Sequence, residues 1–431
     1  MNDARGMLIR GEQVRSDSSF KVMNPYDGVV FATVSEATPS EIEKALSSAA
    51  DGARTMEAMS RHERFVILER VSEKIAGRAD GLARVIASES GKTLKEARAE
   101  VGRAVETFRL SAEEARRLSG EVVPFDGAPT GAGRFGFALR VPLGVVVAIT
   151  PFNFPLNLAA HKVGPAIAAG NSVVLKPSSY TPVTGLELGK ILLESGLPPE
   201  AIAVVTGPGG TVGQALVSDP RPRMVTFTGS ADVGLAITRK AGLKRLAMEL
   251  GSNSAVVVTE HCDVEAAAER SVLASCALAG QVCISVQRVL VQESVKERFL
   301  GRACAFASGL RAGDQLDERT DVGPMIDEAN AKRAQDWIEE AVGAGASVLV
   351  GGDRDGSVFS PTIMTDVPET ARLWSDEAFA PVMSVRGFGD LDEAIALVNR
   401  SRYGLAAGVY TDRMEQGLRA AHEIRCGGVM V

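Results

Sequence analysis

The chain has 431 residues, of which 45% are hydrophobic and 23% are charged, and its formal net charge is -7. This is the composition of a globular protein long enough for two or more domains, and its acidic balance argues against a nucleic-acid partner. No apolar run reaches membrane-spanning length and the N-terminus lacks a signal-peptide pattern, so we expect a cytoplasmic protein with no membrane partner.

The first part of the chain is predicted to be helical over residues 38–117. Thr38 and Glu41 have the spacing of a capping box, with Pro39 at the first helical position. Residues 120–141 are rich in glycine and alternate polar with apolar side chains, which predicts a β-hairpin. A hairpin buries little surface by itself, so we expect it to pack on another subunit.

From Leu143 onward the pattern changes to alternating strands and helices. Strands are predicted at 145–150, 172–176, 201–206, 224–227 and 254–258, with helices at 158–169, 182–194, 211–216 and 233–241. A second block follows, with strands at 289–291 and 347–350 and helices at 296–309 and 330–343. This alternation predicts an α/β fold with a parallel, doubly wound sheet.

Three segments of this region have candidate binding chemistry. Asn153 stands between two prolines, where a turn residue is the simplest interpretation and an amide donor to an oxyanion is the functional one. The glycine-rich run 206–213 follows a predicted strand and opens a helix, which suits a phosphate, although a single such match is weak. The run 226–230 at the next strand–helix junction is a second candidate anion site.

Glu249 and Cys283 are the candidate catalytic pair. Glu249 ends an apolar segment, where it is either a partly exposed strand-terminal carboxylate or a general base that activates water. Gly280 and Gln281 precede Cys283, and we expect a flexible approach that presents the thiol at a cleft. The other cysteines, Cys262, Cys276, Cys304 and Cys426, are predicted to be small hydrophobic residues. No CxxC pair occurs and histidines are few, so we expect neither a disulfide scaffold nor a metal site.

At these residues the chain resembles the NAD(P)-dependent aldehyde dehydrogenase superfamily. The motifs that carry the resemblance occur in order along the chain: Pro151-Phe-Asn153-Phe-Pro155, Leu175-Lys176-Pro-Ser178, Phe227-Thr-Gly229-Ser230, Glu249-Leu-Gly251, Gly280-Gln281-Val-Cys283, Asp376-Glu377-Ala-Phe379-Ala-Pro381 and Asn399 with Tyr403-Gly404-Leu405. The branch that it most resembles includes lactaldehyde, glyceraldehyde-phosphate and phosphonoacetaldehyde dehydrogenases. The resemblance extends from about Asn24 to the last residue.

The resemblance implies an aldehyde dehydrogenase-like fold of three parts. A Rossmann-type dinucleotide domain would comprise residues 1–117 and 142–252, an oligomerisation hairpin residues 118–141, and an α/β catalytic domain residues 253–431. Members are usually homodimers or homotetramers. The implied reaction is the oxidation of a small aldehyde to its acid with NAD or NADP, through a thiohemiacetal and a thioester on the cysteine.

The resemblance also implies roles for individual residues. Cys283 would be the nucleophile, Glu249 the base, Asn153 an oxyanion donor and Lys162 a group that assists proton transfer. The residues implied to contact the cofactor are Thr150, Pro151, Phe152, Lys176, Ser178, Ser179, Gly209, Gly213, Phe227, Thr228, Gly229, Ser230, Val233, Leu250, Gly251, Glu377 and Phe379. Arg103 and His161 fall in segments that line the substrate tunnel of relatives, which makes an anionic aldehyde a candidate. For Arg103 the alternative is a solvated helix face with Glu100 and Glu106 at ion-pair spacing.

Departures from the commonest family pattern leave alternatives open. Ser179 stands where NAD-preferring members often have glutamate, so a 2′-phosphate would meet no like charge and NADP use is plausible. Ala380 replaces a common glycine beside the cofactor. Family chains usually continue past Val431 with a loop and a strand, so the alternative of a non-catalytic dinucleotide-binding protein is kept. A coenzyme A-acylating enzyme is a further alternative, disfavoured by the presence of Glu249.

Overall fold

The computed structural model describes residues 4–431, which form two compact units. One comprises the chain up to Val22 with residues 30–85 and 98–249, and the other comprises residues 23–29, 86–97 and 250–431. The main division therefore lies at Glu249, close to the predicted boundary, and two short N-terminal segments belong with the second unit. The functions assigned to the predicted domains stay predictions.

The helices before the hairpin are α1 (Pro39–Ala58), α2 (Arg61–Ala76), α3 (Ala79–Ser90) and α4 (Leu94–Arg117). Thr38 and Glu41 form the predicted capping box of α1, and Ser60 and Glu63 form a second one on α2. Each box satisfies backbone N–H groups that a helix start would otherwise leave without partners. No helix among residues 4–431 is both long enough and apolar enough to cross a lipid bilayer.

The first unit is built on a seven-stranded sheet with the order β11-β10-β7-β8-β9-β1-β2. The strands in that order are Arg245–Glu249, Pro222–Thr228, Val145–Ile149, Ser172–Lys176, Ile202–Val204, Met7–Ile9 and Glu12–Val14. The first five are parallel neighbours, and β1 and β2 complete the sheet in antiparallel pairing. The predicted parallel α/β sheet is confirmed. A separate two-stranded sheet joins β3 (Ser19–Met23) and β4 (Val30–Ser35).

Helices connect the parallel strands and cover them. The crossovers contain α5 (Asn157–Ala168), α6 (Pro182–Glu194), α7 (Gln214–Ser218) and α8 (Ala231–Lys240). Strands β7 and β8 are buried along their whole length, as expected when both faces of a parallel sheet are covered. Burial on both faces explains why these strands are rich in aliphatic residues, mainly valine.

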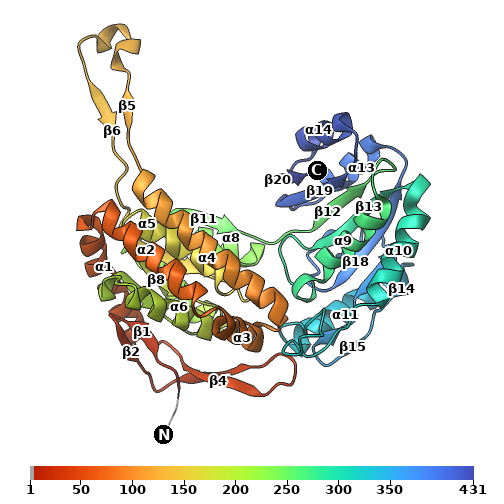
Figure 1. Ribbon diagram of the computed structural model, residues 1–431, viewed down its shortest axis with the longest axis horizontal. Coiled ribbons are helices and arrows are strands. Elements are labelled where there is room, and N and C mark those ends of the chain that lie inside the picture. Colours follow the sequence, from red (N-terminus) through yellow and green to blue (C-terminus); the bar gives the residue numbers. More distant parts are fainter. Residues whose placement is uncertain (1–3) are drawn as a thin grey trace. The chain divides into compact units, whose positions relative to one another are not determined.

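The predicted hairpin is present and extends away from the helices of the first unit (Figure 1). Its paired strands, β5 (Glu121–Val123) and β6 (Gly136–Ala138), are only three residues each. The large apolar side chains Phe135, Phe137 and Val141 are exposed, with Phe135 at 78%. Such a concentration of exposed apolar residues on a projecting hairpin is typical of an interaction surface.

The second unit also contains a seven-stranded sheet, with the order β14-β17-β18-β13-β12-β19-β20. The strands in that order are Ser347–Val350, Thr362–Thr365, Val382–Phe388, Val286–Gln292, Ser254–Val258, Ala406–Tyr410 and Gly428–Met430. Only the β14–β17 pairing is antiparallel. Its helices are α9 (Val264–Cys276), α10 (Lys296–Ser308), α11 (Glu328–Gly343), α12 (Arg372–Ser375), α13 (Leu391–Asn399) and α14 (Met414–Glu423), and β15 (Arg354–Asp355) pairs with β16 (Val358–Phe359).

Close packing of α1 generates a prediction about stability. An added Cβ at Gly52 in α1 would overlap the backbone carbonyl of Glu200, whereas nothing lies within 4 Å of an added Cβ at Gly102 in α4. We predict that Gly52→Ala lowers the free energy of unfolding by about 2 kcal/mol through overpacking. Gly102→Ala, the matched control, should raise it by up to about 1 kcal/mol through helix propensity. Urea denaturation would measure both, and an equal response of the two variants would contradict the packing argument.

Candidate active site

In the first unit, predicted site residues collect at the carboxyl ends of the parallel strands. Thr150 follows β7, Lys176 ends β8, and Thr228 and Glu249 end β10 and β11 as direct register partners. Parallel strands end at the same edge of a sheet, which is where α/β proteins bind their ligands. The sheet therefore brings together residues that are up to about a hundred positions apart in sequence.

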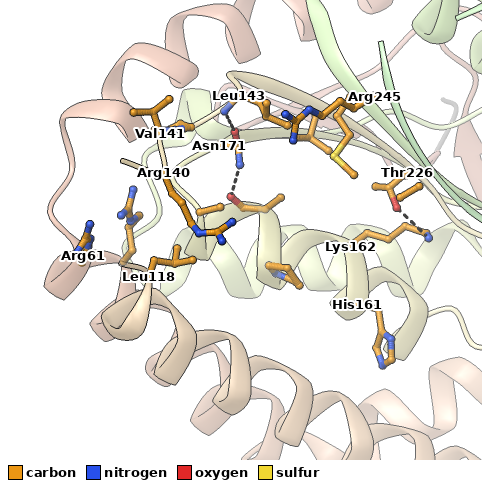
Figure 2. Close-up of a pocket in the computed structure, with 18 of the residues that line it drawn as sticks. Arg61, Leu118, Arg140, Val141, Leu143, His161, Lys162, Asn171, Thr226 and Arg245 are labelled. Atoms are coloured by element: carbon orange, nitrogen blue, oxygen red, sulfur yellow. Dashed lines mark hydrogen bonds between the residues drawn. The ribbon is translucent and has the colours of Figure 1, made fainter. Parts of the chain in front are cut away.

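Lys162 is one of two buried lysines at this edge. It lies on α5, and its Nζ donates a hydrogen bond to Thr228 Oγ1 at 2.7 Å. A second, to Thr226 Oγ1 at 3.3 Å, is drawn in Figure 2. Burial lowers the pKa of Lys162 to about 8, against the opposing effect of the nearby Glu249 carboxylate. An amine with this pKa can gain or lose a proton close to neutral pH, which is what a proton-transfer role requires.

The Asn153 segment is held by a buried carboxylate. Glu100 on α4 is fully buried, and its Oε1 accepts hydrogen bonds from the backbone amides of Leu156 at 2.9 Å and Asn157 at 3.0 Å. Asn153 itself is 4% exposed. Glu100 therefore anchors the start of α5, and the solvated helix face considered for Arg103 is wrong in this respect, since Glu100 faces the protein interior.

Arg103 and His161 lie within electrostatic range of each other. The guanidinium of Arg103 stacks over the Phe154 ring, 4.6 Å from its centroid, and among residues 4–431 it forms no ion pair with an acidic side chain. Burial lowers the pKa of His161, and the positive charges of Lys162 and Arg103 lower it further, while Glu249 raises it. The strand-terminal Glu249 is itself exposed. The structure thus groups Arg103, His161, Lys162 and Glu249 in one region.

A mainly apolar cavity of about 360 Å³ lies beside the glycine-rich run. The predicted cofactor residues Gly209, Gly213, Phe227 and Val233 line it, together with Ile149, Val217, Ala236 and Ile237, which the motifs did not reveal. Ser230 caps α8, since its Oγ accepts a hydrogen bond from the Val233 amide. An apolar cavity next to glycines and a helix start fits the flat base and the phosphates of a dinucleotide.

Lys176 and Ser179 extend this region. Lys176 is buried, its Nζ donates to the Pro177 carbonyl at 2.9 Å, and burial lowers its pKa to about 8. Ser179 Oγ donates to the Gly207 carbonyl at 2.9 Å, so it ties the loop after β8 to the glycine-rich run. A buried ammonium beside a small hydroxyl suits a ribose hydroxyl or a 2′-phosphate.

In the second unit, the predicted site residues lie at the amino ends of the parallel strands, whereas those of the first unit lie at the carboxyl ends. Ser252 precedes β12, Cys283 precedes β13 and Glu377 precedes β18. Because β12, β13 and β18 are parallel neighbours, their amino ends meet at one edge. The structure therefore places Gly251, Cys283, Glu377 and Phe379 on loops at the same edge of this sheet.

The loop before Cys283 is closely packed in an uncommon backbone conformation, and the expected flexible approach stays a prediction. Leu278, Ala279 and Gly280 adopt consecutive left-handed conformations with φ of 49°, 51° and 72°. An added Cβ at Gly280 would overlap the Ala380 carbonyl, so only glycine fits there. Positive φ at Leu278 and Ala279 costs free energy and persists only where surrounding contacts impose it.

Two side chains hold this loop: Glu96, which sequence reasoning missed, and Gln281, whose contacts it did not predict. Glu96 Oε1 accepts a hydrogen bond from the Leu278 amide at 2.7 Å, and its other oxygen accepts from Thr93 Oγ1 at 2.9 Å. Gln281 donates to the Leu278 carbonyl at 3.0 Å and accepts from the Ile326 amide at 2.9 Å. No sequence signal ties Glu96 to a loop that lies 182 positions away.

Glu377 belongs to a second set of hydrogen bonds. Its Oε1 accepts from the Ser252 amide at 2.9 Å, and burial raises its pKa, against the opposing effects of that hydrogen bond and of the Arg333 charge. The buried Gln287 accepts from the Ala378 amide at 2.8 Å and donates to the Ser252 carbonyl at 3.3 Å. Gln287 was also missed, although a buried amide inside the apolar run of β13 could have marked it.

Three of the other four cysteines have thiols whose pKa is raised by burial. Burial raises the pKa of Cys276 to about 12 and that of Cys262 to about 11, and it also raises the pKa of Cys304. These three thiols stay protonated at neutral pH and are poor nucleophiles. Cys276 alone is fully buried, and Cys262, Cys304 and Cys426 are half-buried.

Comparisons with known proteins agree with this arrangement. The sequence model of the aldehyde dehydrogenase family matches residues 13–431. A 3-sulfolactaldehyde dehydrogenase from Priestia aryabhattai is 41% identical over 426 residues, which are 99% of this chain and 89% of the relative. Aldehyde dehydrogenase 21 from Physcomitrella patens, solved with its reaction product succinate, has a TM-score of 0.97 at 35% identity, covering 100% of this chain and 90% of that one. The glyceraldehyde-3-phosphate dehydrogenase GapN from Methanocaldococcus jannaschii, solved with NADP, has a TM-score of 0.92 at 36% identity, covering 96% and 90%.

The buried Lys176 gives a pH-dependent prediction. Its pKa is about 8 in the folded chain and 10.5 in the unfolded chain. Below pH 8 the buried amine is therefore charged in the folded state, and the unfavourable burial of this charge lowers the free energy of unfolding by its full amount. Between pH 8 and 10.5 the unfolded state binds more protons, and this cost disappears as the pH rises. We predict that Lys176→Met raises the free energy of unfolding at pH 7 by on the order of 2 kcal/mol, and that this gain shrinks toward pH 10.5.

Thermal and urea unfolding of the parent and of Lys176→Met at pH 7 and pH 10 would check this. The exposed Lys21→Met is the matched control and should change stability little at either pH. A variant that is less stable than the parent at pH 7 would show that Lys176 is compensated within the fold.

Proposed function

Because this chain belongs to the aldehyde dehydrogenase family, we propose that it oxidises a small anionic aldehyde to its carboxylic acid with NAD(P)+. The predicted family, fold and enzyme class are confirmed by the family match and by the solved structures. One observation carries the assignment of residues. The left-handed loop of residues 278–280 leads to Cys283 and packs against the Ala380 carbonyl, so it lies beside the loop that carries Glu377. The residue roles below are part of the proposal.

The Cys283 thiolate adds to the aldehyde carbon and forms a C–S bond, while the carbonyl oxygen becomes an alkoxide. We assign Asn153 as a side-chain donor to this oxyanion. A fixed donor of this kind contributes several kcal/mol in a dry site because it needs no reorganisation during the reaction. The burial of Asn153 and the anchoring of its segment by Glu100 support this role.

When bound, NAD(P)+ supplies the acceptor for the hydride that leaves the substrate carbon. We assign the apolar cavity beside Gly209 and Gly213 to the adenine end, with Lys176 and Ser179 near its ribose. Glu377 would hold the other ribose, with Phe379 near it. The absence of a carboxylate at Ser179 supports NADP as well as NAD, since a 2′-phosphate there would meet Lys176 and no like charge.

Glu249 then takes a proton from water, which attacks the thioester and releases the acid and the thiolate. The exposed position of Glu249 at the end of β11 supports this role, because a general base for water needs a solvent path. Lys162 lies close enough for each charge to influence the other, and with a pKa of about 8 it can pass the proton onward.

The substrate assignment depends on Arg103 and His161. The relatives act on sulfolactaldehyde and glyceraldehyde-3-phosphate, and one was solved with succinate. With its pKa lowered, His161 is mostly neutral at pH 7, so Arg103 supplies the positive charge for an anionic group. Its lack of an acidic partner within residues 4–431 leaves that charge available.

We further propose a homodimer or homotetramer in a cytoplasmic setting. The exposed apolar residues of the 118–141 hairpin support assembly, because a second subunit would cover them. The thiol state of all five cysteines supports a reducing compartment, which also keeps a nucleophilic thiol active.

The proposal is tested by nicotinamide reduction at about 340 nm with a panel of small aldehydes and either cofactor. Cys283→Ala should lower the rate by about a thousandfold or more while the protein stays folded. Cys304→Ala, a half-buried thiol on α10, is the matched control and should retain activity. Activity that survives in Cys283→Ala would exclude this cysteine as the nucleophile, and strict dependence on coenzyme A would favour the acylating alternative.

The anionic preference makes a separate prediction. Arg103→Ala should lower kcat/KM for succinic semialdehyde by about tenfold or more and leave that for butyraldehyde nearly unchanged. Arg109→Ala is the matched control on the same helix, because Arg109 is exposed and already paired with Glu106 at 2.7 Å. If the ratio of the two efficiencies does not change in Arg103→Ala, the assignment of Arg103 to substrate is wrong.

A further inference from the structure

A second cavity of the first unit has a strongly basic lining, and only His161 and Lys162 among its basic residues belong to the proposed active site (Figure 2). Its volume is about 630 Å³, within the range of small-molecule sites. It lies between the first turn of α2, the end of α5, the base of the hairpin, the edge strand β11 and its neighbour β10. The basic side chains that line it are Arg61, Arg64, Arg140, His161, Lys162 and Arg245.

The four arginines of this lining have no acidic partner within residues 4–431, whereas the Glu249 carboxylate acts on His161 and Lys162. Neither aspartate nor glutamate lines the cavity, and within the same residues Arg61, Arg64, Arg140 and Arg245 form no ion pair. This is unexpected in a chain with a formal net charge of -7, whose other arginines are mostly paired with carboxylates. Converging positive charges with no counter-charge produce a local potential that attracts anions.

Arg64 is a buried cation of this lining with an unpartnered donor. It is 7% exposed, lines the cavity, and its Nε has no hydrogen-bond partner among the described residues. Burial lowers the pKa of Arg64 and so does the adjacent positive charge of Arg61. A guanidinium keeps its proton under these conditions, so a charged donor is buried without compensation, which is costly unless an anion completes it.

The wall beside Arg64 is fixed in position. An added Cβ at Gly170 would overlap the Arg64 guanidinium, and Gly170 has φ of 83°. Next to it, Asn171 Oδ1 accepts from the amides of Leu143 at 2.7 Å and Gly144 at 3.0 Å, and its amide group donates to the Ala166 carbonyl at 3.1 Å. The end of α5 and the base of the hairpin are therefore tied together, so the cavity is formed before any ligand binds, which lowers the entropic cost of binding.

We propose that this cavity binds a small multivalent oxyanion, a phosphate ester or a di- or tricarboxylate, through the guanidinium groups of Arg61, Arg64 and Arg140. Guanidinium groups match the geometry of phosphate and carboxylate oxygens with paired hydrogen bonds. The site is distinct from the proposed nucleophile, because none of its three arginines is part of the aldehyde chemistry. Leu139, Arg140 and Val141 belong to the base of the hairpin, so a bound anion would also fix how the hairpin leaves the first unit.

The test is isothermal titration calorimetry of the full chain with citrate and, separately, with inorganic phosphate, in buffers matched in ionic strength with sodium chloride. We expect one site per chain, with affinity that falls as chloride is raised, because screening weakens the attraction. Arg61→Gln and Arg140→Gln, both exposed residues whose loss should not unfold the chain, should each weaken binding by about tenfold or more. Comparing citrate with phosphate distinguishes the carboxylate from the phosphate source.

Arg15→Gln is the matched control. It removes an exposed arginine that forms no ion pair within residues 4–431 and lies outside the cavity, so its anion affinity should equal that of the parent. The proposal is overturned if neither anion binds, or if Arg61→Gln and Arg140→Gln bind as the parent does. Sedimentation gives a further test. If Arg61→Gln and Arg140→Gln lose self-association, and neither anion changes the sedimentation of the parent, then a second copy of the chain fills the cavity and the proposal is overturned. Dehydrogenase activity plays no part in these readouts.

Discussion

The parallel pairing of β12, β13 and β18 is the constraint on which the second unit depends. Parallel strands in register place their amino ends along one line, so the loops that carry Ser252, Cys283 and Glu377 cannot separate without breaking backbone hydrogen bonds. The overlap that any side chain at Gly280 would produce with the Ala380 carbonyl joins two of these loops directly. The nucleophile loop therefore owes its unusual conformation to its neighbours and not to its own sequence.

In the first unit the candidate site residues lie at the carboxyl ends of the parallel strands, and buried charges distinguish this edge. There, two lysines are buried at the sheet edge, and each has lost most of its hydration. The fold tolerates this cost because hydroxyl and carbonyl oxygens partly replace water around each ammonium. In the same unit the guanidinium of Arg64 is buried with an Nε that has no hydrogen-bond partner among the described residues. The positive charge of Arg64 is therefore less well stabilised than that of the two lysines.

Sequence reasoning predicted the positions of the strand ends well, but it did not predict the side-chain hydrogen bonds that link the loops at those ends. Lys176, Thr228 and Glu249 end strands whose apolar runs are visible in sequence, so their meeting at one edge could be anticipated. The fold followed from the same pattern, with boundaries mostly within a few residues. The roles given to the site residues still rest on motif positions and stay predictions.

What could not be predicted was tertiary in origin. Glu96 and Gln287 are ordinary helix and strand residues until the fold brings them to Leu278 and Ala378. Gly280 suggested a flexible loop, because sequence shows the freedom of glycine but not the carbonyl packed against it. The basic cavity is assembled from separate segments, each with only one or two of its arginines, so no local charge pattern marked it.

The hydrogen bonds around Cys283 and Glu377 have a consequence for motion within the second unit. The amides of Leu278, Ala378 and Ser252 are each held by a buried or half-buried side chain. The loops that carry Leu278 and Ala378 pack together where Gly280 meets the Ala380 carbonyl. A loop in such a cluster cannot open alone, because its opening would strip partners from the others. These three amides should therefore exchange with deuterium through one shared opening, at similar rates, and not as three independent sites.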